Sequence, residues 1–328
     1  MPNQSIMADT QVGDRRQVRP VRLVFVGLGG IGRATVAECL KQEAFSVMGA
    51  VDPAFRGTSL GGLVVQGGLD ELDRVDADVA VIATSSSVQG IRSQVEWSLD
   101  NGMHVVSSCE ELTFPWASAS EAASDLSAKA IAAGKSILAC GVNPGFVMDV
   151  LPVFLSSASQ QVQSLRVRRE ADLSRRRPQL RAKLGVGMDM DEWNNSAKER
   201  RYGHVGLVES ALLCAAGLGW EVENRHFIRT PIQEHDKVIG VHEEVEVRCR
   251  GDRAISLELL FAIGAHDEDS VHVEGTPPIR VLIESGLHGD SATVARILHS
   301  AAAVDRLAPG LRLPIEAPIS AFSVLAAH

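Results

Sequence analysis

Short and nearly continuous apolar runs alternate with helical patterns through the first half of the chain. The runs cover residues 21–26, 47–51, 79–83, 104–106 and 137–140. Such runs are typical of parallel strands that are buried on both faces of a sheet. Apolar residues between the runs recur at helical spacing, as Val36 and Leu40 do after the first run. The alternation predicts an α/β fold with a parallel sheet.

The pattern changes near the sequence Asn143-Pro144-Gly145. Strand patterns beyond this point are longer and alternate between apolar and polar residues, over residues 165–171, 243–249 and 255–262. The last two flank Arg250-Gly251-Asp252-Arg253, which is a hairpin turn signal. We therefore expect a second α+β domain built on an open, mostly antiparallel sheet. A final helical pattern near Val294 has an apolar face, which we expect to return to the first domain for burial.

These elements divide the chain into four expected parts. Residues 1–19 are polar, and we expect them to form a flexible tail. Residues 20–145 are expected to form the first domain, and residues 146–290 the second. Residues 291–328 are expected to be a C-terminal segment that returns to the first domain.

The composition excludes several classes of function. A hydrophobic share of 45% with 22% charged residues is that of a globular protein, and the net charge of -9 argues against nucleic acid or an anionic membrane as a partner. No apolar run reaches the roughly 18 residues of a membrane span, and the N-terminal stretch lacks the apolar segment of a signal peptide. The five scattered cysteines form no CxxC pair, which fits a reducing cytoplasm and gives no metal-site spacing.

A glycine-rich turn follows the first apolar run directly, at Gly27-Leu28-Gly29-Gly30-Ile31-Gly32. Its G-x-G-x-x-G spacing between a strand and a helix is typical of dinucleotide-binding Rossmann domains. Gly27 allows the tight turn, Gly29 allows close approach of a pyrophosphate, and Gly32 allows close packing of the helix on the strand. The N-terminus of the following helix offers free N–H groups to the phosphates. We therefore expect NAD or NADP to bind over Gly29, Gly30 and Ile31.

Residues after the next strands are further candidates for cofactor contacts. Asp52 ends the second strand, where a carboxylate can bind the hydroxyls of the adenosine ribose. Its charge favours NAD, but Arg33 and Arg56 are near enough in sequence to offset it, so the preference between NAD and NADP stays open. Thr84 and Ser85 follow another strand at the ligand-binding edge of the sheet, where they can contact the cofactor or cap the next helix.

Two adjacent carboxylates, Glu110 and Glu111, follow the fifth strand at the same edge. One of them can act as a general acid or base beside the nicotinamide, or both can simply begin a helix. Cys109 can be a thiol nucleophile or a small buried side chain. His204 lies between two glycines and can line a ligand pocket or start a helix. The arginines between residues 168 and 177 can bind a substrate carboxylate or be solvated.

Several segments resemble the 2,4-diaminopentanoate dehydrogenase family, which includes the native amine dehydrogenases and shares the dihydrodipicolinate reductase-like fold. The segments are residues 109–116 (CEELTFPW), 141–146 (GVNPGF), 175–178 (RRRP), 203–210 (GHVGLVES), 289–293 (GDSAT) and 308–311 (APGL). The likeness extends from about residue 21 to about residue 314, and the Cys-Glu-Glu and Gly-His-Val-Gly-Leu blocks are its most specific parts. The paired histidines and lysine motif of true dihydrodipicolinate reductases are missing, which argues against a role in a lysine pathway.

The resemblance implies NAD(P)-dependent interconversion of an amine and a carbonyl compound, with ammonia as co-substrate. It implies that Glu110 is catalytic, and that the cofactor site includes Cys109, Asn143 and Pro144. It also implies a substrate site formed by Asn143, Phe146, Arg168 and His204. Members of the family are homodimers joined largely through the second domain, so we expect a homodimer. The alternatives are an imine or carbonyl reductase of the same fold and a non-enzymatic NAD(P)-binding sensor.

Overall fold

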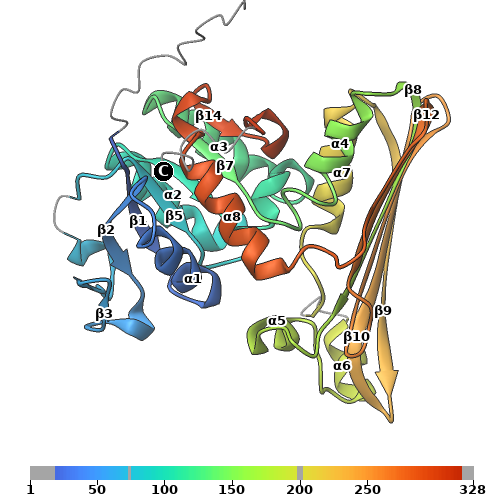
Figure 1. Cartoon of the computed structure of the whole chain (residues 1–328), viewed down its shortest axis with the longest axis horizontal. Coiled ribbons are helices and arrows are strands. Elements are labelled where there is room, and N and C mark those ends of the chain that lie inside the picture. The colour runs from blue at the N-terminus through green and yellow to red at the C-terminus, as the bar shows by residue number, and fades with distance from the viewer. Residues whose placement is uncertain (1–18, 73–74, 198–201, 320–328) are drawn as a thin grey trace, which may run out of the picture.

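The computed structural model describes residues 19–72, 75–197 and 202–319. The expected N-terminal tail therefore lies outside the described residues, apart from its last residue, Arg19. Figure 1 shows two lobes side by side, one with a sheet between helices and one with a longer, open sheet.

The first lobe is built on a six-stranded sheet in which every neighbouring pair is parallel. The strand order is β14-β7-β6-β5-β1-β2. This sheet confirms the α/β Rossmann domain predicted from the apolar runs. Its strands are β1 (Val21–Val26), β2 (Phe45–Val51), β5 (Val79–Ile82), β6 (His104–Ser107), β7 (Ser136–Ala139) and β14 (Gly310–Arg312).

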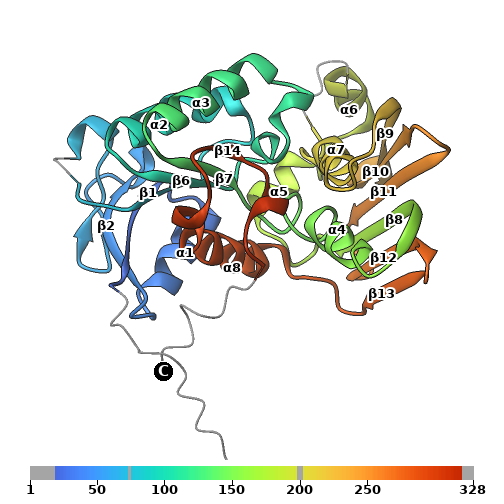
Figure 2. The ribbon, with the colours of Figure 1, turned by 90° about the horizontal axis from the view of Figure 1, so that it is seen from above.

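Helices cover both faces of this sheet, which explains why most positions of its strands are apolar. Leu23 and Phe25 pack toward α1 and α8, whereas Val24 and Val26 pack toward α2 and α3. Figure 2 shows the two helix pairs on opposite sides of the strands. The helices are α1 (Gly30–Cys39), α2 (Val88–Asp100), α3 (Ser120–Ala132) and α8 (Gly289–Ala301), and a small hairpin of β3 (Ser59–Leu60) and β4 (Leu63–Val64) lies beside β2.

The last helix and the last strand of the chain belong to the first lobe. Helix α8 packs against α1, and its buried face carries Val294, Ile297 and Leu298. Strand β14 then pairs with β7 and forms the edge of the sheet. The chain thus leaves this lobe after β7 and re-enters it at α8.

The second lobe is built on a six-stranded sheet with the order β13-β12-β8-β11-β10-β9. Four of its five pairs are antiparallel and β8 runs parallel to β11, which confirms the expected mostly antiparallel sheet. The predicted hairpin turn at Gly251 joins β10 to β11. The strands are β8 (Gln160–Asp172), β9 (Val222–Glu234), β10 (Lys237–Cys249), β11 (Arg253–Ala262), β12 (Glu268–Thr276) and β13 (Ile279–Ile283).

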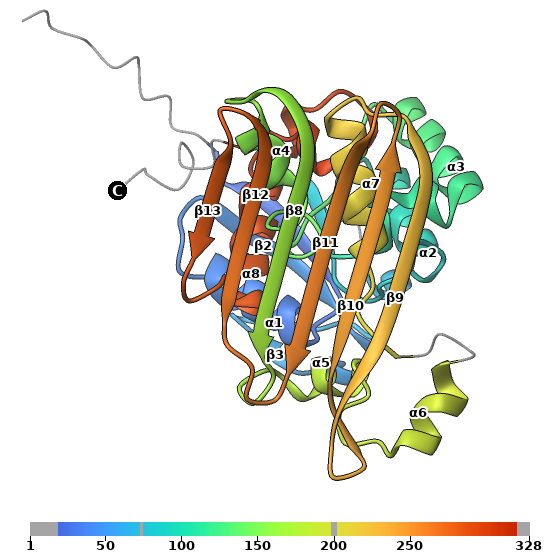
Figure 3. The ribbon, with the colours of Figure 1, turned by 90° about the vertical axis from the view of Figure 1, so that its right-hand side faces the viewer.

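Helices α4 (Val150–Ser156) and α7 (Leu207–Gly217) cover the inner face of this sheet. Figure 3 shows the outer face of the sheet, which no element of the described residues covers. Side chains on that face are largely polar, and Arg168, Glu258 and His242 form a chain of contacts across it. Helices α5 (Pro178–Lys183) and α6 (Met190–Ala197) lie at one end of the sheet.

The described residues contain no helix with the length and apolar character needed to cross a membrane. They also contain no cluster of three or more histidine, cysteine or acidic side chains that could hold a metal ion. All five cysteines are free thiols with buried side chains.

A buried ion pair joins the second sheet to the segment that leads back into α8. Arg169 on β8 and Asp269 on β12 are 3% and 1% exposed, and Nη1 of Arg169 donates to both carboxylate oxygens at 2.8 and 2.9 Å. Leu287 bonds to both partners, since its N–H donates to Asp269 and its carbonyl accepts from Arg169. The pair therefore fixes the backbone two residues before α8 begins.

We predict that Asp269→Asn lowers the free energy of unfolding by about 3–5 kcal/mol, because it leaves a buried guanidinium uncompensated. Urea unfolding followed by circular dichroism measures the change. Glu258→Gln is the matched control, since it removes a carboxylate from the half-exposed pair with Arg168, and it should cost less than about 1 kcal/mol. Equal losses in the two variants would contradict the prediction.

Candidate functional site

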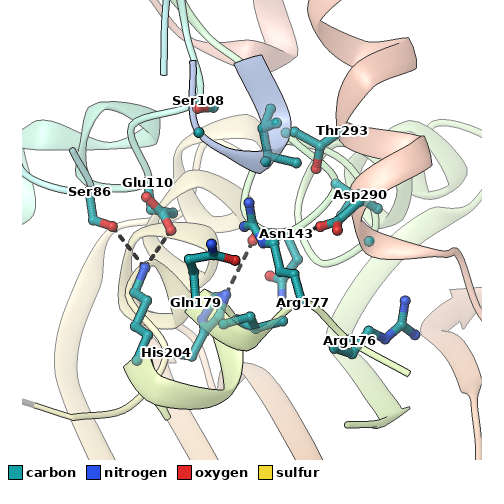
Figure 4. A pocket seen from close by; sticks show the side chains of 18 of the residues that line it. Ser86, Ser108, Glu110, Asn143, Arg176, Arg177, Gln179, His204, Asp290 and Thr293 are labelled. Carbon is teal, nitrogen blue, oxygen red and sulfur yellow. Dashed lines mark hydrogen bonds and ion pairs between the residues drawn. The ribbon is translucent and has the colours of Figure 1, made fainter. Parts of the chain in front are cut away.

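A cavity of about 350 Å³ lies where the carboxyl ends of β1, β5, β6 and β7 face the second lobe. Ligands of open α/β sheets bind at this edge. The second lobe contributes the end of β8, helix α5, the loop before α7 and Phe261 of β11. Figure 4 shows Ser86 and Glu110 on one side of the cavity in that view, and Asp290 and Thr293 of α8 on the other.

The glycine-rich turn has the shape that a dinucleotide needs. Gly27 has a φ of +93°, a left-handed conformation that favours glycine. A Cβ on Gly32 would lie 2.0 Å from the carbonyl oxygen of Gly27, so only glycine allows this packing of α1 on β1. A Cβ on Gly29 would meet nothing within 4 Å, because this position opens into the cavity. The turn therefore fits a diphosphate over Gly29, Gly30 and Ile31, which all line the cavity.

Asp52 braces the same turn. One of its carboxylate oxygens accepts from the N–H of Leu28 at 2.7 Å, and the other accepts from the N–H of Ala54 at 2.9 Å. The carboxylate links the end of β2 to the glycine turn, which is a structural role that the sequence does not reveal. The remaining lone pairs of its oxygens are still available to a ribose hydroxyl.

The other residues of the first lobe that the sequence offered as cofactor contacts do not all line the cavity. Thr84 and Ser85 line the cavity, and the hydroxyl of Thr84 also donates to Gln94 at 2.6 Å. Arg56 does not line the cavity and instead pairs with Glu71 at 3.1 Å. Arg33 stacks on the ring of Phe55, with 4.8 Å between the guanidinium carbon and the ring centre.

The two adjacent glutamates have different environments. Glu110 lines the cavity, whereas Glu111 turns away and accepts from the N–H of Val88 at 2.9 Å, the first residue of α2. A carboxylate at a helix N-terminus satisfies a free N–H and interacts well with the helix dipole. Glu111 thus has the helix-starting role that the sequence offers for both residues, and Glu110 alone faces the cavity.

Lys183 at the end of α5 is the partner of Glu110, and the sequence analysis did not identify it. Its Nζ lies 2.6 Å from Oε1 of Glu110 and donates to the hydroxyl of Ser86 at 2.8 Å, as the dashed lines in Figure 4 show. Burial raises the pKa of Glu110, but the attraction and hydrogen bond of Lys183 outweigh burial and hold this pKa below its ordinary value. Glu110 is therefore an ionised carboxylate at neutral pH.

His204 lies in the cavity as a neutral imidazole. Burial and the nearby Lys183 lower the pKa of His204 to about 3. Its Nε2 lies 3.2 Å from the carbonyl oxygen of Asn143, which can only accept, so we assign the ring hydrogen to Nε2. Among the described residues the buried Nδ1 has no hydrogen-bonding partner, so it presents a lone pair. Glu243 holds this loop in place by accepting from the N–H of His204 at 2.7 Å and from Arg229 at 2.6 Å.

A buried carboxylate fixes the loop that follows β7. Asp149 accepts from the N–H of Gly145 at 2.8 Å and from the hydroxyl of Ser210 at 2.6 Å. Asn143 and Pro144 of this loop line the cavity. Both polar atoms of the Asn143 side chain are buried and form no hydrogen bond within the part of the chain that the structure describes, so the amide has a free donor and a free acceptor. Such a group is suited to a polar ligand, because a buried amide is normally hydrogen-bonded.

Several candidates from the sequence do not line the cavity, and three of them have a clear place elsewhere in the structure. Arg168 is on the outer face of the second sheet, paired with Glu258 and Glu170, because residues of a strand alternate between faces. Its neighbour Arg169 lines the cavity instead, and this corrects the expectation. Phe146 packs into the core of the second lobe. Cys109 is buried, and burial raises the pKa of its thiol to about 12, which argues against a nucleophile.

We predict that Gly29→Val abolishes binding of NADH while the fold stays intact. The new side chain would enter open space and so leave the fold undisturbed. It would occupy the region that the diphosphate needs. Isothermal titration calorimetry measures binding, and circular dichroism checks the fold. Gly32→Ala is the contrasting variant, because its Cβ clashes with Gly27 and should lower the melting temperature. Unchanged NADH affinity in Gly29→Val would place the diphosphate elsewhere.

Two comparisons of the sequence with known proteins agree on one family of dehydrogenases. The 2,4-diaminopentanoate dehydrogenase C-terminal domain family matches residues 146–326. A 2,4-diaminopentanoate dehydrogenase of Acetoanaerobium sticklandii is 25% identical, over 91% of this chain and 94% of that protein.

Two solved structures are similar in fold. An amine dehydrogenase from Mycobacterium smegmatis superposes with a TM-score of 0.81 at 18% identity, over 91% of this chain and 96% of that one. The GenD2 protein of gentamicin A biosynthesis, solved in complex with NAD, has a TM-score of 0.59 at 17% identity, over 95% and 93% of the two chains. The family match confirms the expected oxidoreductase with an NAD or NADP cofactor. The chain belongs to the 2,4-diaminopentanoate dehydrogenase family.

Proposed function

We propose that this protein is an NAD(P)-dependent amine dehydrogenase in which Glu110 transfers the proton. The observation that carries the proposal is the ionised carboxylate of Glu110, which shares one cavity with the glycine-rich turn. The family match supports a reaction at an amine carbon. The substrates are then an amine or carbonyl compound and ammonia.

In the direction of amine formation, ammonia adds to the carbonyl carbon and water leaves, which produces a positively charged iminium group. The bound dinucleotide supplies the hydride that reduces this group. Glu110 takes a proton from ammonium and gives one to the departing hydroxyl. After this second transfer Glu110 is a carboxylate again and stabilises the iminium charge, and Lys183 orients it and favours its ionised form before the first transfer and after the second.

The neighbouring polar groups suit a nitrogen substrate. The lone pair on Nδ1 of His204 can accept from an N–H of ammonia or of the amine product. A neutral histidine suits this place better than an imidazolium, which would repel the positive iminium. The side-chain amide of Asn143 can bind the cofactor carboxamide or the substrate through its free donor and acceptor.

The apolar part of the cavity offers space for the carbon skeleton of the substrate. Ala171, Leu173, Leu180 and Phe261 of the second lobe line it. These side chains cannot hydrogen-bond, so they favour an aliphatic or aromatic group over a sugar. They therefore support an amine with an apolar substituent.

Two further properties belong to the proposal. The family resemblance implies a homodimer, and the outer face of the second sheet, which no described element covers, is its proposed interface. Sedimentation velocity tests this assembly, and a monomer at micromolar concentration would contradict it. The five free, buried thiols support a cytoplasmic location, where such thiols stay reduced, and localisation of a tagged protein tests this.

We predict that NADH oxidation with a ketone or aldehyde requires ammonium, and that Glu110→Gln lowers this turnover by roughly 10²- to 10⁴-fold. Glutamine keeps the size of the side chain but cannot exchange a proton. NADH affinity should change little, since the carboxylate faces the substrate. Glu111→Gln is the control, because its side-chain oxygen can still accept from Val88 and turnover should stay near normal.

Other outcomes of the same assay separate the alternatives. Equal turnover without ammonium would indicate a carbonyl reductase, and turnover only with a preformed imine would indicate an imine reductase. NADH binding without any turnover across a panel of amines and carbonyl compounds would indicate a sensor. Near-normal turnover of Glu110→Gln would require another proton-transfer residue.

We predict that Lys183→Met shifts the acidic limb of the kcat/KM profile to higher pH. The wild-type pKa of Glu110 is held down by Lys183, and the variant keeps the burial but loses the attraction. The carboxylate then takes up its inactivating proton at a higher pH. Arg181→Met removes a cation from the same helix outside the cavity lining, and its profile should match that of the wild type. An unshifted limb in Lys183→Met would contradict this role.

A further inference from the structure

Arg177 crosses from the second lobe to the glycine-rich turn of the first. It precedes α5 directly, and its side chain reaches over Gly30 at the start of α1. A Cβ on Gly30 would lie 3.4 Å from both Cδ and Nη1 of Arg177. The guanidinium is therefore in contact distance of the backbone that Rossmann domains use for phosphates.

The charges at this contact are unbalanced. The N-terminus of α1 is a positive dipole end, and its first turn contains no acidic residue. Arg177 adds a full positive charge to the same place. Its only described ion pair joins this charge to Asp290 of α8, whose Oδ1 lies 3.5 Å from Nε, and the buried Nε forms no hydrogen bond among the described residues. Two like charges that face each other are stabilised when an anion lies between them.

Space for such an anion lies next to both charges. Gly29 opens into the cavity with no atom near its missing Cβ, and the cavity lining includes Gly30, Arg177 and Asp290. Figure 4 shows Arg177 near the middle of the cavity, between Glu110 and Asp290 in that view. The site therefore has a donor-bearing helix end on one side and a guanidinium on the other.

We propose that Arg177 binds the diphosphate of the dinucleotide directly, so that both lobes hold the cofactor. Arginine suits this role, because its planar fork matches two phosphate oxygens and stays charged at any physiological pH. Asp290 positions the guanidinium from the α8 side through the ion pair at 3.5 Å. The proposal rests on the dinucleotide cofactor of the proposed function, and it does not depend on the identity of the amine substrate.

The test uses ADP-ribose, which contains the diphosphate but no nicotinamide, beside NADH. Isothermal titration calorimetry of the full chain measures both dissociation constants in the wild type and in Arg177→Met. We expect both ligands to bind roughly 10- to 100-fold more weakly to the variant, which is the usual effect of one lost charge-assisted contact. Arg177→Lys keeps the positive charge but lacks the planar guanidinium. Its dissociation constants should therefore lie between those of the wild type and of Arg177→Met.

Arg175→Met is the matched control, since it removes an exposed arginine from the same segment outside the cavity lining. Its affinities should stay within about twofold of the wild type. Unchanged ADP-ribose affinity in Arg177→Met would overturn the proposal, and so would an equal loss in Arg175→Met, which would indicate a general field effect. If Arg177→Met fails to fold by circular dichroism, Arg177→Gln decides by the same criteria. A wild type that binds ADP-ribose but turns over no amine would contradict the proposed function alone.

Discussion

The ion pair between Glu110 and Lys183 is the interaction on which the site depends. The carboxylate follows a strand of the first sheet, and the ammonium ends a short helix beside the second sheet. Burial alone would favour a protonated, uncharged Glu110, so the lysine decides which form the cavity contains. The same lysine also helps to keep His204 neutral. One cation thus sets the charge state of two neighbouring groups, and moving α5 would change both.

Five of the six strands in the sheet of the first lobe could be predicted from the sequence, and only the short edge strand β14 could not. The strands of this sheet are buried on both faces, so their apolar runs are continuous, and the glycine turn has a local spacing with a direct steric meaning. The position of Glu110 also follows from local information, because a residue just after a parallel strand must lie at the ligand-binding edge. The pattern of the residues leaves open which of Glu110 and Glu111 faces the ligand, and only the family resemblance selects Glu110. The physical reason for the difference is the contact of Glu111 with Val88, which no local pattern shows.

Residues of the second lobe were harder to place, because their roles depend on contacts between distant parts of the chain. Lys183 and Arg177 reach the cavity only because α5 lies against the first lobe, which no local pattern encodes. The position of Arg168 on the outer face could have been predicted from the alternation along β8. Leu165 and Val167 of β8 alternate with polar residues, and continuing that period of two puts Arg169, and not Arg168, on the inner face.

The path of the chain has a consequence for how this protein can be divided. The nucleotide-binding lobe is encoded by two separated stretches, because α8 and β14 follow the whole second sheet in the sequence. A gene fragment that stops after β7 would lose α8, which covers one face of the sheet together with α1. The second lobe is thus an insertion within the first, and recombination would have to exchange it through two junctions at once. Its substrate-facing residues can diverge while the cofactor-binding frame is inherited as one unit.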